Sequence, residues 1–216
     1  MKKILSALAI GALLAGCTPD EKASTATSSA PPTVWQGSAD MTNTTLHKYI
    51  VDNDISEYPF RPEEPDTPKV DFPMPPDWSD AGDQTPEWAY GAIKYDKAVD
   101  PDDPPVVIAI ASKLTGDVDP EKILEYAPGQ LNELPEFTPI GEPEKDSLGG
   151  FEAIDYAGTY VWEGKKRIVG QQTIVVPGKD AVYVLQLNGD ALDGQQDVVL
   201  DAAKVIAEKT TITVPS

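Results

Sequence analysis

The chain contains one cysteine and one histidine, the residue types that most often supply a nucleophile and a general base. Ser-His-Asp or Cys-His catalysis would have to use His47, because the base must lie within hydrogen-bond reach of the nucleophile. The sequence has no G-x-S-x-G motif to present a serine nucleophile. Cys17 stands at the end of an apolar N-terminal stretch, and this position predicts a role other than catalysis. His47 falls on the polar side of a short predicted helix, so we expect a solvent-exposed side chain. The sequence therefore predicts neither a catalytic residue nor an enzymatic activity.

Acidic residues cluster at Asp100–Asp103, at Asp117 and Asp119, and along Asn188–Gly194, so calcium binding needs to be weighed. An EF-hand loop requires alternate oxygen ligands, a glycine at its sixth place and a glutamate at its twelfth, and the run Asn188–Gly194 breaks that pattern. Zinc sites use cysteine and histidine. We expect no metal and no cofactor. The 36 acidic residues form many carboxylate pairs by chance, so a carboxylate-based hydrolase is kept only as an alternative.

Aromatic residues are the remaining candidates for ligand contact: Trp78, Trp88, Tyr90, Tyr95, Tyr160 and Trp162, with Tyr156 beside them. On an antiparallel sheet Trp88 and Tyr90 project to one face, and alternate residues of a second strand do the same. One interpretation is core packing against helices. The other is an apolar slot for an acyl chain or a platform for a sugar, on which indole rings stack and phenol hydroxyls orient the ligand. Nothing in the sequence places these strands side by side, so both interpretations stay open.

Cys17 ends the run L-A-G-C, which follows the basic start Met1–Lys3 and the uncharged stretch Ile4–Ala15. A basic start and an apolar segment of about a dozen residues are typical of a secretory signal, and the segment is too short to span a bilayer. L-A-G-C is similar to the lipobox of bacterial lipoproteins. That resemblance implies cleavage before Cys17 and a diacylglycerol, with chains such as palmitate, on its thiol. The alternative is an ordinary secretory signal that ends near a cysteine.

The charge balance limits the kinds of molecule that the chain can bind. The chain has 17 basic and 36 acidic side chains, a net charge of −19, and removing Lys2 and Lys3 with the signal leaves 15 and 36, or −21. Such a surface repels phosphate backbones and anionic head groups, so we expect no nucleic acid. Membrane attachment has to come from the lipid on Cys17, whose two chains suffice for stable anchoring. We expect a cell-membrane protein on the extracytoplasmic side, in the periplasm or at the cell surface.

The sequence divides into a signal peptide (1–16), an acylated cysteine with a disordered tether (17–45), and a globular domain (46–216). Residues 18–33 consist of Ser, Thr, Ala, Pro, Asp, Glu and Lys and cannot bury enough apolar surface to fold. A coil of about 28 residues averages roughly 30 Å end to end, so the domain can stand off the membrane. With the one cysteine acylated, the domain has no disulfide and depends on its core.

The sequence of the globular domain predicts an α+β fold. The predicted strands, in chain order, are 70–72, 88–95, 106–111, 136–143, 150–162, 167–176, 181–187 and 210–214. The predicted helices are 44–51, a helix that follows the capping Asp119 and is interrupted at Pro128–Gly129, and a C-terminal helix with the buried stripe Val198, Val199, Ala202, Val205 and Ile206. Runs of strands flanked by helices indicate an antiparallel sheet with helices packed on it.

Four runs carry a family resemblance: W-A-Y-G-A-I-K-Y (88–95), K-L-T-G-D-V-D-P (113–120), I-L-E-Y-A-P-G-Q-L (123–131) and Y-V-L-Q-L-N-G-D-A (183–191). They resemble the LpqN/LpqT family of mycobacterial lipoproteins, and the resemblance extends from about residue 46 to residue 214. One departure is Asp77-Trp78, where related sequences tend to have Gly-Trp. The resemblance implies an α/β/α sandwich similar to Mog1 and PsbP, an actinobacterial cell envelope and no catalytic motif.

The resemblance also implies contact with envelope glycolipids such as trehalose mycolates and with the machinery that transports them. We therefore expect a membrane-anchored, non-enzymatic lipoprotein that binds such a glycolipid or the outer domain of a membrane transporter. Two partners anchored in one membrane meet at a raised effective concentration. The alternative is a surface-exposed interaction module whose acidic face binds a basic protein. Salt would weaken that contact strongly, whereas lipid capture would be nearly indifferent to it.

Overall fold

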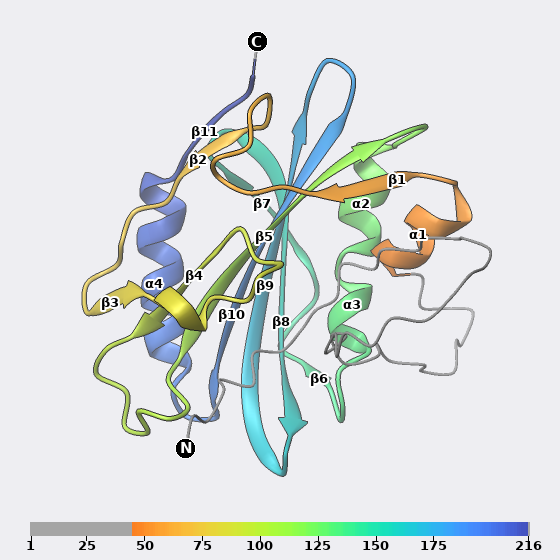
Figure 1. Cartoon of the computed structure of the whole chain (residues 1–216). Helices are drawn as coiled ribbons and strands as arrows, with labels where there is room; N and C mark the ends of the chain where they lie inside the picture. Colours follow the sequence, from red (N-terminus) through yellow and green to blue (C-terminus); the bar gives the residue numbers. More distant parts are fainter. Residues whose placement is uncertain (1–44, 216) are drawn as a thin grey trace, which may run out of the picture.

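The computed structural model describes residues 45–215, which form one large sheet with helices on both faces (Figure 1). The predicted signal peptide, Cys17 and the predicted tether up to residue 44 lie outside the described residues. Between residues 45 and 215 no helix is both long and apolar enough to cross a membrane. The predicted α+β class, an antiparallel sheet flanked by helices, is confirmed.

The main sheet has nine antiparallel strands within residues 45–215. Its principal order is β3 (Trp78–Asp80), β4 (Gly91–Tyr95), β5 (Val106–Thr115), β10 (Val182–Leu192), β9 (Lys165–Pro177), β8 (Phe151–Trp162) and β6 (Thr138–Pro139). In addition β1 (Ser56–Pro59) pairs with β5, and β7 (Glu144–Leu148) pairs with β8. A separate ribbon joins β2 (Lys69–Asp71) to β11 (Thr211–Thr213). The long strands β5, β10, β9 and β8 therefore form the centre of the molecule.

Helices cover the two faces of this sheet unequally (Figure 1). The helices on one face are α1 (Leu46–Asp52), α2 (Pro120–Tyr126) and α3 (Gly129–Asn132), and we call this the α1–α3 face. The other face carries α4 (Gln196–Lys209), and we call it the α4 face. A single turn of 3₁₀ helix, η1 (Gly82–Gln84), joins β3 to the segment before β4.

The short helices begin and end where the sequence predicts. Thr45 caps α1, and Asp119 caps α2 by accepting a hydrogen bond from the Glu121 N–H at 2.9 Å. Pro120 occupies the first turn of α2, where a missing N–H is harmless. The chain is interrupted at Pro128–Gly129, which separates α2 from α3. An interruption at this point, as a kink or as two short helices, is the prediction, and the structure has two short helices.

Helix α4 packs through the predicted stripe. Ala202 and Ile206 are buried, and the three valines of the stripe are half-buried. Asp197 in the first turn and Lys209 in the last turn complement the helix dipole. The helix packs chiefly on β10, so it leaves parts of β9 and β8 on the same face uncovered.

Strand β5 has apolar residues on both faces, as its unbroken apolar run predicts. Val107, Ala109 and Ala111 belong to the core on the α4 face. Ile108 and Ile110 point the opposite way and pack with alanines of the segment before β4 and of β4 itself. Both faces of β5 are therefore buried, which identifies it as a central strand.

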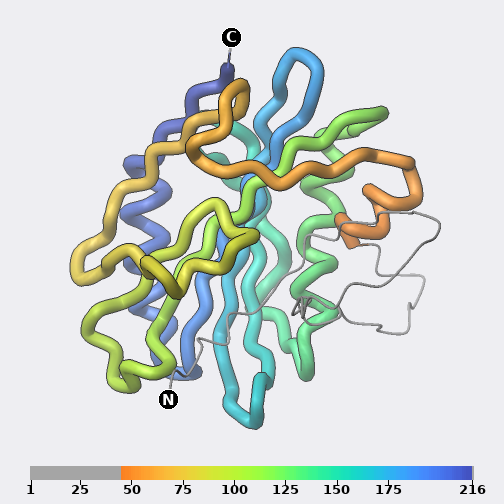
Figure 2. The backbone as a smooth tube through the Cα atoms, viewed as in Figure 1, coloured from red at the N-terminus to blue at the C-terminus, as the bar shows by residue number. Residues whose placement is uncertain are grey.

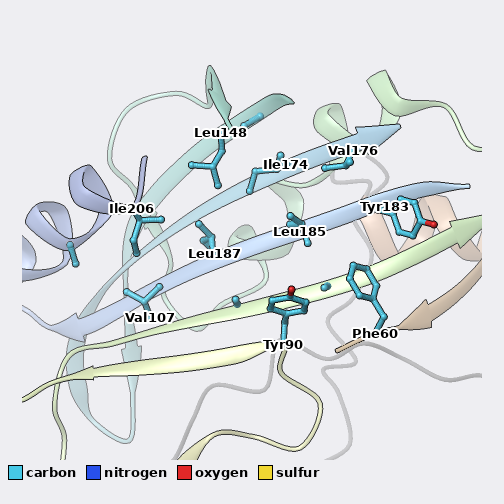
Figure 3. Close-up of a cluster of buried hydrophobic side chains, with 14 of the residues drawn as sticks. Phe60, Tyr90, Val107, Leu148, Ile174, Val176, Tyr183, Leu185, Leu187 and Ile206 are labelled. Atoms are coloured by element: carbon cyan, nitrogen blue, oxygen red, sulfur yellow. The ribbon is translucent and has the colours of Figure 1, made fainter. Parts of the chain in front are cut away.

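The segment between α1 and β4 crosses from the α1–α3 side of the molecule to the α4 side (Figure 2). It pairs first with β5 through β1 and then with β11, which follows α4. Phe60 lies just after β1, and its ring contacts Tyr90 and Tyr183 edge-on, with centroids 5.8 and 5.7 Å away (Figure 3). These contacts fix the crossing segment to the core.

Two predicted strands are too long, whereas β5 and β10 extend beyond their predicted ends at residues 111 and 187. The strand predicted over 88–95 begins only at Gly91, because the Ala89 N–H donates to the Pro86 carbonyl at 3.0 Å and forms a turn. The strand predicted over 136–143 shrinks to β6, because Gly141 adopts φ 78° and bends the chain. The charged strand β7 that follows, like the short strands β1 and β3, lacks the apolar alternation from which strands are predicted.

Candidate functional site: a groove beside helix α4

A groove lies on the α4 face, between α4 and the edge of the sheet formed by β7 and β8. Its volume is about 450 Å³, within the range of about 300–1,000 Å³ typical of small-molecule sites. Val107, Leu187 and Ile206 line one side of it, and their side chains lie close together between β5, β10 and α4 (Figure 3). That side of the groove is therefore continuous with the apolar core.

The floor is hollow because three small residues stand in register on three neighbouring strands. Gly189 of β10 pairs with Gly170 of β9, and Gly170 pairs with Ala157 of β8. A Cβ built on Gly170 would touch only the Ala157 Cβ, at 4.0 Å, so it would project into the groove. A Cβ on Gly189 would collide with the side chain of Val199 on α4. Gly170 therefore gives the groove its depth, and Gly189 allows α4 to lie against the sheet.

The upper walls carry exposed apolar side chains. On α4 the wall is built from Val199, Leu200 and Ala203, and on the opposite side from Ile140, just after β6. Leu200 and Ile140 are each 53% exposed, although both are large and apolar. Two such side chains flanking one groove point to an apolar ligand that would cover them.

The end of the groove next to β7 is acidic. Glu142, Glu144, Asp146 and Asp155 all line it. Glu144 stands opposite Asp155 in the β7–β8 pair, so the two side chains lie on the same face of the sheet. Gln172, which faces Asp155 from β9, donates a hydrogen bond of 3.3 Å to Asp146.

Asp155 is the most perturbed carboxyl of this group. Burial raises its pKa to about 6, the Gln172 amide opposes that rise, and the negative charges of Asp146 and Glu144 add to it. Its Oδ1 atom is buried and has no hydrogen-bond partner among residues 45–215. The carboxyl therefore offers an unused acceptor at the boundary between the apolar floor and the acidic end.

This arrangement suits an amphipathic molecule. The apolar floor and walls can bury a hydrocarbon chain, and the carboxylates at one end can accept hydrogen bonds from hydroxyl groups. Within the part of the chain that the structure describes, no three His, Cys, Asp or Glu residues are grouped so as to hold a metal ion.

A protein-family model described as "Probable lipoprotein LpqN" matches residues 42–213. The chain belongs to the LpqN lipoprotein family. It is 47% identical over 171 residues to the lipoprotein LpqN of Mycobacterium tuberculosis (strain ATCC 25618 / H37Rv), an alignment that covers 79% of this chain and 75% of that protein. The resemblance found in four sequence runs is therefore confirmed, and with it the lipoprotein class.

The crystal structure of LpqN from Mycobacterium tuberculosis, a protein described as involved in cell envelope biogenesis, has the same fold. It superposes with a TM-score of 0.76 at 48% identity and covers 79% of this chain and 98% of the crystallised one. The crystallised LpqN chain therefore consists almost entirely of this domain, which shows that the family's domain folds by itself. Membership of a lipoprotein family indicates a membrane-anchored envelope protein, whereas acylation of Cys17 and the side of the membrane stay predictions.

Three of the aromatic residues predicted to contact a ligand lie in the core of this LpqN-family domain. Trp78 and Tyr90 are buried, and Tyr95 is half-buried. The Trp78 and Tyr95 rings lie 5.7 Å apart, and Tyr90 contacts Phe60 and Phe72 edge-on. Their surroundings are those of core packing, the first of the two interpretations.

The other three predicted residues lie on the α1–α3 face. Trp88 packs against the small cluster that contains Ile108 and Ile110. Tyr160 and Trp162 are alternate residues of β8. They pack in one cluster with Leu131 of α3 and with Leu134, which follows α3. The six residues are thus divided among three clusters on two faces, and the structure does not bring them together in one slot.

Buried charges also lie on the α1–α3 face, where they form a closed network. Tyr160 donates to Asp190 at 2.6 Å, and Arg167 donates to Asp190 and, at 2.8 Å, to Asp103. Lys165 adds a second contact to Asp103. Burial raises the pKa of the Tyr160 phenol, and the Asp190 carboxylate adds to that rise. Each member is bonded to another member, so we read the network as structural.

His47 is half-buried, which corrects the prediction of a solvent-exposed side chain. It lines a cavity of about 30 Å³ between α1 and the sheet, together with Gln130 and Gln186. Burial raises the pKa of the nearby Glu133, and the charge of His47 opposes that rise. The cavity is about large enough for one water molecule.

The small and acidic residues that build the floor and the acidic end of the groove were not picked out from the sequence, although Tyr156, named among the aromatic residues above, is one of the lining residues. Gly170, Gly189 and Ala157 look alike as ordinary small residues of strands, because their meaning depends on the pairing of strands. Asp155 did carry a signal: it is a carboxyl inside a strand between the apolar residues Ile154 and Tyr156. An acid at such a position is often functional.

Proposed function

We propose that this chain is a non-enzymatic carrier that binds an envelope glycolipid such as a trehalose mycolate in the groove beside α4. The diacylglycerol on Cys17 would hold it at the membrane, on the extracytoplasmic side. There it would assist transport of the glycolipid by exchanging it with a membrane transporter. The observation that carries the proposal is the groove, with its floor of small residues and its acidic end.

The dimensions and chemistry of the groove support an acyl chain as occupant. Its volume of about 450 Å³ holds only part of a long chain, and the exposed Leu200 and Ile140 flank the opening. Each buried methylene contributes about 0.8 kcal/mol, so about ten of them contribute ~8 kcal/mol before the entropic cost of binding. That sum suits a carrier, which must release what it binds.

The acidic end supports a sugar as head group. Sugar hydroxyls donate hydrogen bonds, and the carboxylates of Glu144, Asp146 and Asp155 accept them. The M. tuberculosis relative, which shares 47% of the aligned residues, is described as involved in cell envelope biogenesis. A glycolipid of the envelope fits both the groove and that relationship.

The test fills the groove from its floor. Gly170→Leu places a side chain where a Cβ meets nothing closer than 4.0 Å, and the strand conformation tolerates it. The domain from residue 42 is loaded with the neutral fluorophore N-phenyl-1-naphthylamine, and trehalose monomycolate is titrated to displace it. We expect displacement with the wild type, a loss of about tenfold or more in affinity for Gly170→Leu, and an unfolding free energy at least as high as that of the wild type.

Gly91→Leu is the matched control. Gly91 also lies in a strand, has free space around its missing Cβ and does not line the groove. Wild-type binding by Gly170→Leu, or loss of binding only on substitution of Trp88 or Trp162, would place the ligand elsewhere. Recovery of intact glycolipid after long incubation is expected for a carrier; free trehalose that disappears with Asp155→Asn would show a hydrolase instead.

A further inference from the structure

The acidic end of the groove offers many hydrogen-bond acceptors and few hydrogen-bond donors. Four acidic side chains line it, and the cation among the lining residues, Lys204, donates to Asp201 on its own helix at 3.0 Å. The Gln172 amide already donates to Asp146, and the buried Asp155 Oδ1 accepts no hydrogen bond from residues 45–215. A head group that lies here has to bring its own donors.

We infer that the acidic end is a charge filter: it admits lipids whose head group donates hydrogen bonds and carries no negative charge, and it rejects anionic phospholipids. This inference rests on the proposed function, because it takes the groove as the lipid site. It adds which lipids of a membrane can enter.

The filter follows from the hydrogen-bonding chemistry of head groups. A phosphate or carboxylate group only accepts hydrogen bonds, so beside Glu144 and Asp146 it would be desolvated without a partner and repelled. Hydroxyls of a sugar or of glycerol satisfy the same carboxylates, the unpartnered Asp155 Oδ1 included. An ammonium head would also be accepted.

The filter has a clear use for a lipid-anchored domain. Acyl chains on Cys17 would keep the groove close to a membrane surface rich in anionic lipids, whose chains fit the apolar floor as well as those of any glycolipid. Apolar contacts alone cannot distinguish them, since chains of equal length bury equal area. Discrimination therefore has to come from the head group, and repulsion of the wrong partner is an effective way to obtain it.

The experiment compares two lipids with the same acyl chain, one of which carries an additional glycerophosphate group. The domain from residue 42, loaded with N-phenyl-1-naphthylamine, is titrated with 1-myristoylglycerol and with 1-myristoyl-lysophosphatidylglycerol below their critical micelle concentrations. We expect the wild type to prefer the neutral lipid by about tenfold or more at low salt, and added salt to reduce the preference. The rim variant Glu144→Gln/Asp146→Asn should reduce the preference by about fivefold.

Glu152→Gln is the control, because Glu152 belongs to the same hairpin but is exposed on the side away from the groove. It should leave the preference unchanged. Equal affinity of the wild type for the two lipids, or a preference that the rim variant does not reduce, would overturn the filter while leaving the groove a lipid site. If neither 1-myristoylglycerol nor trehalose monomycolate binds the wild type, the proposed function itself falls, and the filter with it.

Discussion

Replacing Asp155 by asparagine should stabilise the domain at neutral pH and leave it nearly unchanged in acid. The two side chains have almost the same shape, so the change removes a charge and little else. The charged groups around this position are Glu144 and Asp146 from β7, Glu142 before β7, and Lys204 from α4. Burial disfavours the ionised form of Asp155 most strongly, and repulsion from Asp146 and Glu144 adds to that effect.

The sign and size follow from the pKa. In the folded state the pKa of Asp155 rises from 3.8 to about 6, so folding favours the protonated form. The stability that this carboxyl contributes is therefore complete below about pH 4 and is lost as the pH rises through about 6. The difference between 3.8 and about 6 corresponds to about 3 kcal/mol for a fully shielded group. Asp155 is half-buried, and solvent screening reduces the expected gain of the asparagine variant to about 1 kcal/mol.

Urea unfolding of the domain from residue 42 measures this gain. We expect the difference between Asp155→Asn and wild type to be near zero at about pH 4 and about 1 kcal/mol at about pH 8, or roughly 2–4 °C in melting temperature. Glu152→Gln removes the same charge from the same hairpin outside the groove, so it reports the general benefit of lowering the net charge. If the difference in unfolding free energy does not change with pH, or if Glu152→Gln reproduces it, the pH-dependent destabilisation does not come from Asp155.

Four further substitutions test the architecture. Gly189→Ala should cost about 1–3 kcal/mol in thermal unfolding because its methyl group displaces α4, whereas Gly170→Ala, on the neighbouring strand, should stay within about 0.5 kcal/mol of wild type or stabilise. Arg167→Met leaves the Asp190 carboxylate buried without its cation and should cost about 3–5 kcal/mol in urea unfolding at neutral pH; a cost below about 1 kcal/mol would show that the network is dispensable. Asp77→Gly should gain roughly 0.5 kcal/mol in thermal unfolding, because Asp77 has φ 64° and its ion pair with a lysine is exposed.

The features predicted well from sequence are those that depend on neighbouring residues. The cap at Asp119, the interruption at Pro128–Gly129 and the stripe of α4 all follow from spacings of a few residues, and the structure confirms them. The rule that alternate residues of a strand share one face also holds for Tyr160 and Trp162, which lie in one cluster. It failed for Trp88 and Tyr90, because a turn ending at Ala89 takes Trp88 out of the strand.

The groove could not be predicted because it depends on register. Its floor requires Gly189, Gly170 and Ala157 to lie side by side, and each comes from a different strand. A shift of one residue in the β9–β10 pairing would turn one of the two glycines away from α4. The acidic end likewise requires β7, which is too polar for its pairing with β8 to be read from the sequence.

The groove combines three local features that each reduce the stability of the domain. Glycine at position 170 costs about 0.5–1 kcal/mol relative to a residue with a side chain, although the structure leaves room for one. Leu200 is half-exposed on α4, and Asp155 is held among other acids with its pKa raised. Unfavourable features of this kind are expected at functional sites, where stability is balanced against a ligand that covers or satisfies them. An acyl chain would fill the space above Gly170 and cover Leu200, and a hydroxyl would satisfy the Asp155 oxygen, so one amphipathic ligand accounts for all three.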